Sequence, residues 1–339
     1  MTQSKVVHFG PLNSKGGMSA VIKNLVGFKY NNIEVFAIAT HREGTPISKL
    51  LIWNKSLKKL KTMINKETID IAHFHVTHSL SWWRKRSLMM TCQKYKIPFV
   101  IHIHSGRFQE FLKSFFGITG LSFKKIVHNN NCKVITLEKR WLEILSNWIP
   151  EDAQFINNPI KIREQRKRVI NSRINLLMLA RNDKTKGHNF AIEVAEELIM
   201  RGYDVRLNLT GYRGKNNIKN GAIEARYWVN EEEKDQLIDN AHFMLLPSKY
   251  EGSSMSIIEA MSRGLPVLST AASFETIGIS KLILDHHNLH QWVDRIIELS
   301  KDDRYEKICN NIYEKSKKFS QNKINKEWNE VYNTLLDKS

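Results

Sequence analysis

The chain has 339 residues, of which 42% are hydrophobic and 25% are charged, as is ordinary for soluble globular proteins. Wholesale disorder is therefore excluded, and the length predicts two domains that can each bury a core. The net charge of +18 is uneven, because residues 1–150 hold 23 basic and 7 acidic side chains, whereas residues 151–339 hold 29 and 27.

The basic amino-terminal half indicates an anionic partner or a charged surface. No apolar stretch approaches the roughly 20 residues of a spanning helix, and the first ten residues show no signal-peptide pattern. Cys92, Cys132 and Cys309 are far apart, so neither a disulfide framework nor a cysteine zinc site is expected. Together these features predict a cytoplasmic protein.

Short apolar runs alternate with amphipathic stretches along the first half of the chain. Strands are predicted at 5–9, 33–39, 71–76, 99–104 and 133–137. Helices are predicted at 18–28, 56–65, 82–95 and 140–148. The loop 10–17, between the first strand and the first helix, is rich in turn-forming residues.

The same alternation restarts after Pro159. Strands are predicted at 174–179, 204–209, 243–246 and 266–269, helices at 188–200, 231–240 and 255–263, and a charged helical tail at 290–336. This order predicts an α/β fold of two doubly wound, Rossmann-like domains with parallel sheets. The predicted domains are 1–165 and 166–319, with a final helix at 320–339 that packs back on the first domain. Ligands of such sheets bind beyond the carboxyl ends of the strands.

The strongest motif is the run 247–267, PSKYEGSSMSIIEAMSRGLPV. Glu251 lies in its loop and Glu259 in its helix, and both carboxylates can accept hydrogen bonds from vicinal hydroxyls. Backbone N–H groups at the predicted helix start suit a phosphate or sugar hydroxyls. The residues at that start are Gly252, Ser253, Ser254, Met255 and Ser256. The motif therefore predicts a binding site for a nucleotide sugar.

A basic loop, LARNDKTKGH at 179–188, follows the first strand of the second half. Arg181 and Lys186 can hold a pyrophosphate through charge-assisted hydrogen bonds, whereas Lys184 is expected to be solvated. Gly211 follows the next strand and is predicted to lie near the nucleotide base.

Two signals in the first half are weaker. Gly16 and Gly17 allow close approach of the backbone to a ligand, although their loop lacks the G-x-G-x-x-G fingerprint. His102 and His104 share one strand face, as His73 and His75 do on another strand. No carboxylate cluster accompanies these histidines, so packed and hydrogen-bonded rings are expected rather than metal ligands.

The motif at 247–267 resembles the E-x7-E region of retaining glycosyltransferases of family 4, of the bacterial polysaccharide-assembly type. The resemblance extends over nearly the whole chain, from Val6 to about Leu336. It implies a GT-B fold, in which two Rossmann-like domains face each other across a cleft. The first domain then binds the acceptor and the second binds the nucleotide-sugar donor.

The resemblance also implies roles for the candidate residues. Arg181 and Lys186 would neutralise the leaving diphosphate. Glu259 would hold the ribose, and Glu251 would orient the sugar. His104 would contact the donor sugar, and the glycine pair would border the donor phosphates.

The implied reaction is transfer of a hexosyl or acetylhexosaminyl group, with retention of configuration, from a UDP-sugar to a glycan or lipid-linked acceptor. Capsule, O-antigen or a similar cell-surface polysaccharide would be the product. No D-x-D sequence occurs in the chain, so neither a metal nor another cofactor is expected.

Basic amphipathic segments in the first half favour a peripheral contact with anionic lipid at the inner face of the membrane. They are the lysine-rich stretch 55–66 and Trp82-Trp83 followed by Arg84-Lys85-Arg86.

Two other functions stay open. A nucleotide-sugar epimerase on the same fold would yield an epimerised sugar nucleotide without acceptor. A basic nucleic-acid-binding protein would bind duplex with a steep salt dependence, but no recognised nucleic-acid motif is present, so no nucleic acid is expected. The intact Arg181, Lys186, Glu251 and Glu259 argue against a catalytically silent subunit.

Overall fold

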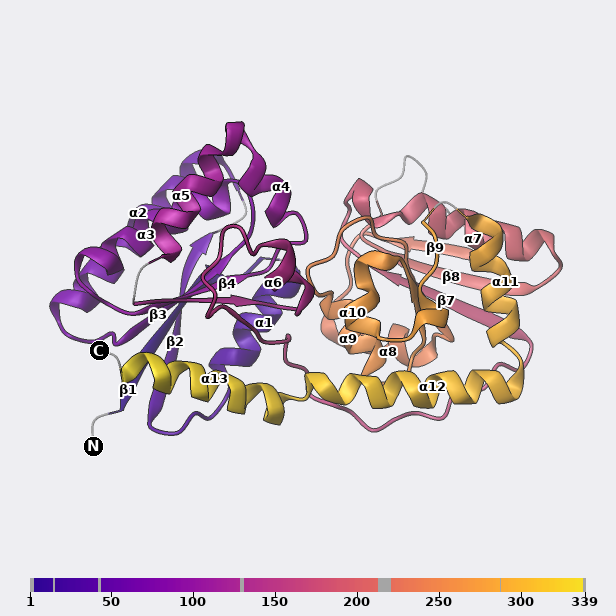
Figure 1. Ribbon diagram of the computed structural model, residues 1–339. Helices are drawn as coiled ribbons and strands as arrows, with labels where there is room; N and C mark the ends of the chain where they lie inside the picture. The colour runs from indigo at the N-terminus through magenta and orange to yellow at the C-terminus, as the bar shows by residue number, and fades with distance from the viewer. Residues whose placement is uncertain are drawn as a thin grey trace. The chain divides into compact units, whose positions relative to one another are not determined.

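The computed structural model describes residues 3–14, 16–41, 44–128, 131–212, 221–286 and 288–337, so Lys15 of the glycine-rich loop lies outside the described residues. The chain divides into two units (Figure 1). The first comprises Met1–Pro159 together with Gln321–Ser339, and the second comprises Ile160–Ser320. No helix in the described part of the chain is long and apolar enough to cross a membrane.

The first unit is built on a six-stranded sheet in the order β2-β1-β3-β4-β5-β6, in which every neighbouring pair is parallel. The strands are β1 (Ser4–Pro11), β2 (Ile33–His41), β3 (Ile71–Val76), β4 (Phe99–Ile103), β5 (Cys132–Thr136) and β6 (Gln154–Phe155). Every residue of β3 and β4 is buried, as is typical of a parallel sheet that is covered on both faces.

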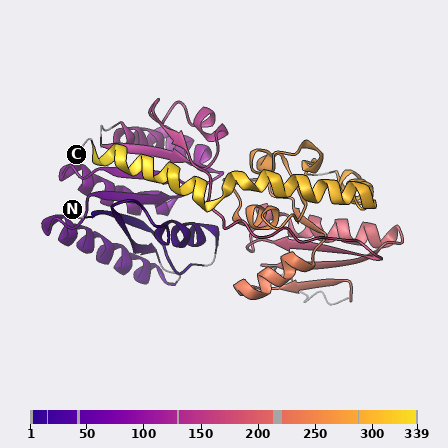
Figure 2. The same cartoon turned by 90° about the horizontal axis from the view of Figure 1, so that it is seen from below.

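The helices of the first unit connect these strands and cover the sheet. They are α1 (Gly17–Val26), α2 (Pro46–Asn65), α3 (Leu80–Lys94), α4 (Phe108–Lys113), η1 (Phe115–Gly117), α5 (Ile118–Val127), α6 (Arg140–Ile144) and α13 (Gln321–Leu336). Helix α13 contacts β3 and lies along this sheet (Figure 2). Its Trp328 and Tyr332 are fully buried, so this helix is part of the core of the first unit.

Two sequence predictions for the first unit were wrong. Helix α2 begins at residue 46 rather than 56, because the Thr45 side chain accepts a hydrogen bond from the Ser48 N–H and caps the helix there. Helices α4 and α5 were not predicted, because η1 and Gly117, at φ +83°, interrupt the helical period between them.

The second unit has a parallel five-stranded sheet in the order β11-β10-β7-β8-β9. Its strands are β7 (Arg173–Leu179), β8 (Asp204–Thr210), β9 (Ile223–Arg226), β10 (Phe243–Leu246) and β11 (Val267–Ser269). From β7 the chain adds β8 and β9 on one side of that strand, and it then adds β10 and β11 on the other side. The carboxyl ends of β7, β8 and β10 therefore form the switch point where doubly wound sheets bind ligands.

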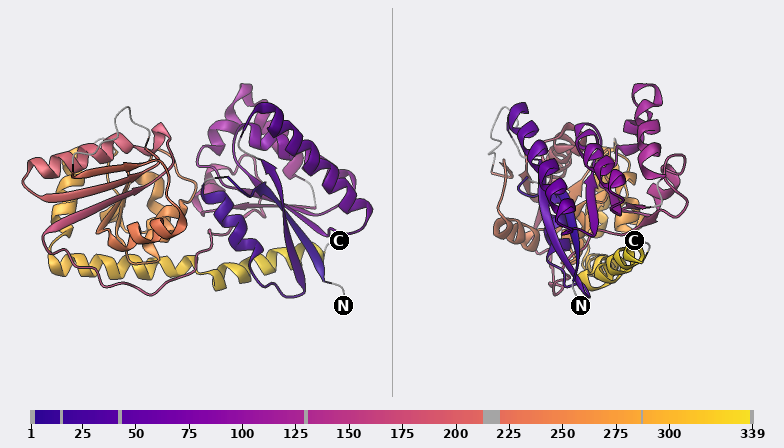
Figure 3. Two further views of the ribbon diagram at one scale, coloured as in Figure 1. Left: turned by 180° about the vertical axis from the view of Figure 1, so that it is seen from behind. Right: turned by 90° about the vertical axis from the view of Figure 1, so that its left-hand side faces the viewer.

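Helices cover both faces of the second sheet (Figure 3). They are η2 (Lys184–Lys186), α7 (His188–Met200), α8 (Glu231–Asn240), α9 (Met255–Met261), η3 (Ala271–Ser273), α10 (Phe274–Ile277), η4 (Ser280–Leu282), α11 (Leu289–Leu299), α12 (Asp302–Ser316) and η5 (Lys317–Phe319). The helical tail predicted at 290–336 is confirmed and comprises α11, α12, η5 and α13, of which α13 corresponds to the final helix predicted at 320–339.

Candidate functional site

The candidate site of the second unit is made by the loops that follow β7, β8 and β10. Two glycines let these loops approach one another. Gly211 has φ +72°, and a Cβ there would collide with the backbone of Ala180 and Arg181. Gly187 has φ +82°, and a Cβ there would lie 2.7 Å from the Pro247 carbonyl oxygen. Both positions therefore require glycine for the conformation and for the close contact.

A largely buried ion pair joins the loop after β7 to the loop after β10. The Lys186 Nζ donates to Glu251 Oε1 at 2.7 Å, and the two side chains are 17% and 7% exposed. Lys186 lies at the end of η2, which Asp183 caps by accepting from the Thr185 N–H. The structure thus brings together two residues that the sequence analysis assigned to different motifs.

Arg181 and Lys184 precede Lys186 in the same loop, and both are exposed. Among the described residues, no carboxylate forms an ion pair with the Arg181 guanidinium, so it is free to bind an anion from solvent.

The loop residues after Glu251 lead directly into helix α9. Gly252 is half-buried, Ser253 is buried, and the Ser254 and Ser256 hydroxyls lie 3.1 Å apart. Helix α9 begins at the buried Met255 and ends at Met261, two residues before its predicted end.

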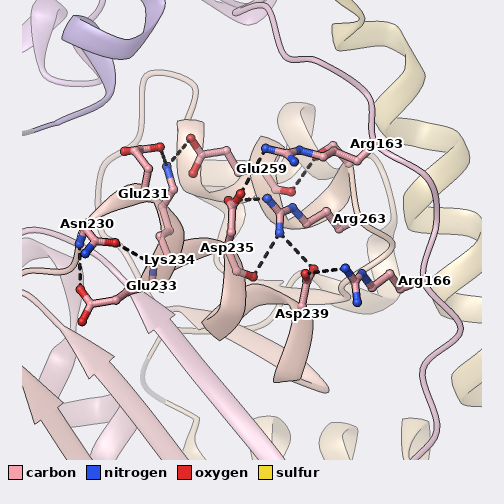
Figure 4. Close-up of polar contacts among 11 residues, drawn as sticks. Arg163, Arg166, Asn230, Glu231, Glu233, Lys234, Asp235, Asp239, Glu259 and Arg263 are labelled. Atoms are coloured by element: carbon pink, nitrogen blue, oxygen red, sulfur yellow. Dashed lines mark hydrogen bonds and ion pairs between the residues drawn. The ribbon is translucent and has the colours of Figure 1, made fainter.

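Glu259 in α9 binds a lysine that the sequence analysis did not select. Its Oε1 accepts from Lys234 Nζ at 3.0 Å, and Lys234 also binds the exposed Glu231 at 2.7 Å (Figure 4). Burial raises the pKa of the Glu259 carboxyl above its usual value, although Lys234 opposes that shift. Burial lowers the pKa of the Lys234 amine, but Glu259 and Glu231 outweigh it and raise that pKa overall.

Contacts at the first turn of helix α8 and along its polar face hold the helix, and Lys234 with it, in place. Asn230 and Glu233 form a reciprocal capping box at its first turn (Figure 4). Arg263, which follows α9, forms ion pairs with both Asp235 and Asp239 of α8. These contacts fix α8 against α9. The run EEEKD has the pattern of a solvated helix face, so nothing in the sequence signalled the role of Lys234.

The other predicted site residues belong to the first unit. Gly16 has φ +136° and stands at the N-cap of α1, and the exposed Gly17 begins that helix. His104 follows β4, and its Nε2 lies 2.9 Å from His75 Nδ1. Burial lowers the pKa of His104 to about 3, with a smaller effect from the positive charge of Lys85, so its ring is neutral at pH 7.

Lys85 has a buried amine in the interior of the first unit, and no carboxylate of the described residues forms an ion pair with it. Its side chain in α3 is 1% exposed, and its Nζ donates to Ser81 Oγ at 2.8 Å. Burial lowers the pKa of Lys85 to about 7, with a further contribution from the neighbouring charge of Arg84. A buried lysine with a lowered pKa is typical of functional sites, and the sequence had placed it only in a basic surface segment.

A cavity of about 580 Å³ in the second unit lies away from these loops. Arg173 and Arg206 line it, and they belong to the amino-terminal ends of β7 and β8. It is therefore at the sheet edge opposite to the candidate site.

A family model and a curated relative match parts of the chain. Residues 173–302 match the model of the family described as glycosyl transferases group 1. This segment contains Arg181, Lys186, Gly211, Glu251 and Glu259. The chain is also 24% identical over 233 residues to the poly(ribitol-phosphate) alpha-N-acetylglucosaminyltransferase of Staphylococcus aureus. The aligned segment covers 63% of this chain and 46% of the relative. The chain thus spans about half the length of this relative.

Solved structures agree on the fold. The sucrose-phosphate synthase from Thermosynechococcus elongatus superposes with a TM-score of 0.76 at 16% identity, covering 99% of this chain and 100% of the other. The S. aureus protein TarM, crystallised with UDP, superposes with a TM-score of 0.66 at 20% identity, covering 84% of this chain and 59% of TarM. The predicted fold of two Rossmann-like domains is confirmed, and residues 173–302 of the second unit match the group 1 glycosyltransferase model. Membership of family 4 in particular stays a prediction.

The buried amine of Lys85 makes the stability of the protein depend on pH. Because its folded pKa is about 7 and the unfolded value is 10.5, the unfolded chain holds more protons between these values, and stability rises with pH through that window. Between about pH 7 and about pH 9 this group should add about 2 kcal/mol to the free energy of unfolding. Denaturant unfolding should show that rise in the wild type and a smaller one in Lys85→Met. Equal pH slopes in the two proteins would show that Lys85 is not buried as a free amine.

Proposed function

We propose that the protein is a glycosyltransferase that moves a sugar from a nucleotide-diphosphate donor to a glycan or lipid-linked acceptor in the synthesis of a bacterial cell-surface polysaccharide. The observation that carries the proposal is the buried Lys186–Glu251 pair at the switch point of a group 1 glycosyltransferase sheet. The names of related proteins support the polysaccharide context, since they include a polymer-specific acetylglucosaminyltransferase.

The proposed reaction breaks the bond between the anomeric carbon and the donor diphosphate. Negative charge grows on the leaving oxygen, so cationic groups that bind it more tightly in the transition state accelerate the step. Lys186 and the exposed Arg181 supply those charges. Glu251, held by Lys186, has a carboxylate to orient the sugar hydroxyls, and Glu259 has one for the ribose.

We propose that configuration is retained by front-face displacement. No residue of the sequence has a context that marks it as a covalent nucleophile, and the donor's own phosphate oxygen would take the acceptor proton. The step needs no metal in this proposal, because Lys186 and Arg181 neutralise the diphosphate.

A uridine nucleotide is the preferred donor in this proposal. TarM, which shares the fold, was crystallised with UDP, and the acetylglucosaminyltransferase relative favours an acetylhexosamine. A nucleotide-sugar epimerase remains the second candidate. Product analysis without acceptor separates the two, since only the epimerase forms a second sugar nucleotide.

We further propose that the first unit binds the inner face of the membrane through the η1–α5 surface. Phe115 and Phe116 are exposed there at 70% and 105%, and Ile118 and Leu121 are exposed beside them. Both phenylalanines also have positive φ, a conformation that bulky residues rarely adopt. Lysines of α4 and α5 add the charge that anionic lipid attracts: Lys113, Lys124 and Lys125.

Loss of the Lys186 amine should slow sugar transfer. We expect Lys186→Met to lower kcat by about 10²- to 10³-fold, because it removes a donor to the developing diphosphate charge. Lys184→Met removes the exposed neighbouring lysine and should leave kcat unchanged. Both are assayed in EDTA, where the wild type should keep its activity. Abolition of wild-type turnover by EDTA, or equal loss in both variants, would contradict the mechanism.

Nucleotide binding should depend on Glu259. Without metal, UDP at about 100 times its dissociation constant should stabilise the wild type by roughly 2.7 kcal/mol, a shift of several degrees in Tm. Glu259→Ala should lose this shift. Glu231→Gln, which alters the other carboxylate on Lys234, should keep it. If no nucleotide raises the Tm of the wild type, the proposed donor site is disproved. If Glu259→Ala and Glu231→Gln respond equally to UDP, the proposed role of Glu259 is disproved.

Membrane binding should depend on the exposed phenylalanines. The wild type should sediment with vesicles that contain anionic phospholipid, and less so at high salt. The double substitution Phe115→Ser and Phe116→Ser should reduce the bound fraction. As a control, Tyr227→Ser with Trp228→Ser removes an exposed aromatic pair of the second unit and should have no effect. Salt-insensitive sedimentation, or none, would rule out the proposed surface.

A further inference from the structure

A cluster of histidines lies on one face of the first sheet and is covered by α13. Its members come from three neighbouring strands and the loop after β4: His8, His73, His75, His102 and His104. The parallel register places His8 beside His73 and His75 beside His102. Trp328 of α13 covers the cluster, with its ring 4.7 Å from His73 and 4.9 Å from His102. The strand periodicity, together with the final helix, thus encloses several imidazoles in one place.

Three of these rings can converge on a single point. One ring nitrogen from each of His75, His102 and His104 lies within 4.8 Å of the other two. Their ring planes are tilted by 37°, 44° and 46° to one another, so their in-plane lone pairs can meet. A second triad replaces His102 and His104 by His8 and His73, but His73 and His75 stack there at 9°, which directs their lone pairs in parallel.

The outward nitrogens of two members of the first triad, His75 and His102, already have hydrogen-bond acceptors. His102 Nδ1 lies 3.2 Å from His73 Nε2, and His75 Nε2 lies 2.9 Å from His8 Nδ1. Ligating histidines ordinarily donate their other ring N–H in this way, which fixes the tautomer. His102 Nε2 is buried and has no hydrogen-bond partner among the described residues.

Tyr332 completes the arrangement of protons. Its hydroxyl oxygen lies 3.1 Å from His8 Nε2 and 2.8 Å from His73 Nδ1, so it can accept from both rings. The other nitrogen of each ring then accepts a hydrogen bond: His8 Nδ1 accepts from His75, and His73 Nε2 accepts from His102. If every ring is neutral, His104 carries one proton, and on Nε2 that proton is donated to His75 Nδ1, 2.9 Å away. Moving that proton to the other nitrogen of His104 frees both lone pairs with no net loss of a proton.

We propose that His75 Nδ1, His102 Nε2 and His104 Nε2 form a binding site for a divalent d-block cation, with Zn²⁺ the best fit. Imidazole nitrogens without carboxylates favour zinc, copper or nickel over Mg²⁺ and Ca²⁺. Tetrahedral zinc at its usual Zn–N distance separates its ligand nitrogens by about 3.3 Å, so the His75–His104 pair needs to open by only about 0.4 Å. His104 is half-buried, which leaves the fourth position to water.

One nearby charge opposes the cation. The amine of Lys85 acts on His104 and is the positive group already described in the interior. Lys85→Met removes this repulsion and should bind the cation at least as tightly as the wild type. The site gives His104 a role other than the sugar contact that the resemblance implies, and it is independent of the proposed sugar transfer.

The test is a Co²⁺ titration of the full chain, prepared without a polyhistidine tag and stripped of metal. Visible absorption of tetrahedral Co²⁺ should saturate at about one ion per chain, and mass spectrometry should find the same content of Zn²⁺ after loading. His104→Gln should bind at least 10-fold more weakly. His73→Gln, which removes an acceptor that positions His102, should weaken binding by about 10- to 100-fold.

His78→Gln is the matched control, because His78 lies near the same sheet edge but bonds Ser105 at 2.6 Å and is outside the triad. It should bind Co²⁺ as the wild type does. Thermal melting without metal shows that each variant is folded. Binding of far less than one ion by the folded wild type would overturn the site, as would equal affinities in His104→Gln and the wild type. Since no donor or acceptor is present in the assay, either result leaves the proposed sugar transfer untouched.

Discussion

The ion pair between Lys186 and Glu251 determines how the edge of the second sheet is built. A carboxylate that is only 7% exposed is costly to bury unless a cation and further hydrogen bonds compensate it. The pair joins loops that are 65 residues apart in sequence, and it forms because β7 and β10 are neighbours. Gly187 and Gly211 allow the three loops to approach closely enough for that contact.

The same interaction sets a condition on ligand binding. Lys186 already donates to Glu251, so an incoming diphosphate must share this ammonium group rather than find it free. The exposed Arg181 has no such prior partner among the described residues. In the proposed reaction the two cations therefore contribute differently, since Arg181 captures the anion and Lys186 links it to the carboxylate that orients the sugar.

The sequence predicted the fold, but it did not predict which of the candidate site residues contact one another. Lys186 and Glu251 were each identified within a local motif, whereas their contact depends on strand order, which periodicity does not contain. Lys234 was missed because EEEKD has the pattern of a solvated helix, and only the packing of α8 against α9 brings it to Glu259. The helices around η1 were missed because a glycine and two phenylalanines at positive φ break their period.

In the first unit, no sequence pattern indicated that His73 of β3 bonds Tyr332, 259 residues further along the chain. This contact makes the first unit discontinuous in the chain, with the whole of Ile160–Ser320 inserted before its last helix. A ribosome therefore finishes the second unit before it makes Trp328 and Tyr332. At about 5–20 residues per second, the apolar and imidazole-rich face of the nascent first unit stays uncovered for on the order of ten seconds, a period in which exposed apolar surface is prone to aggregation.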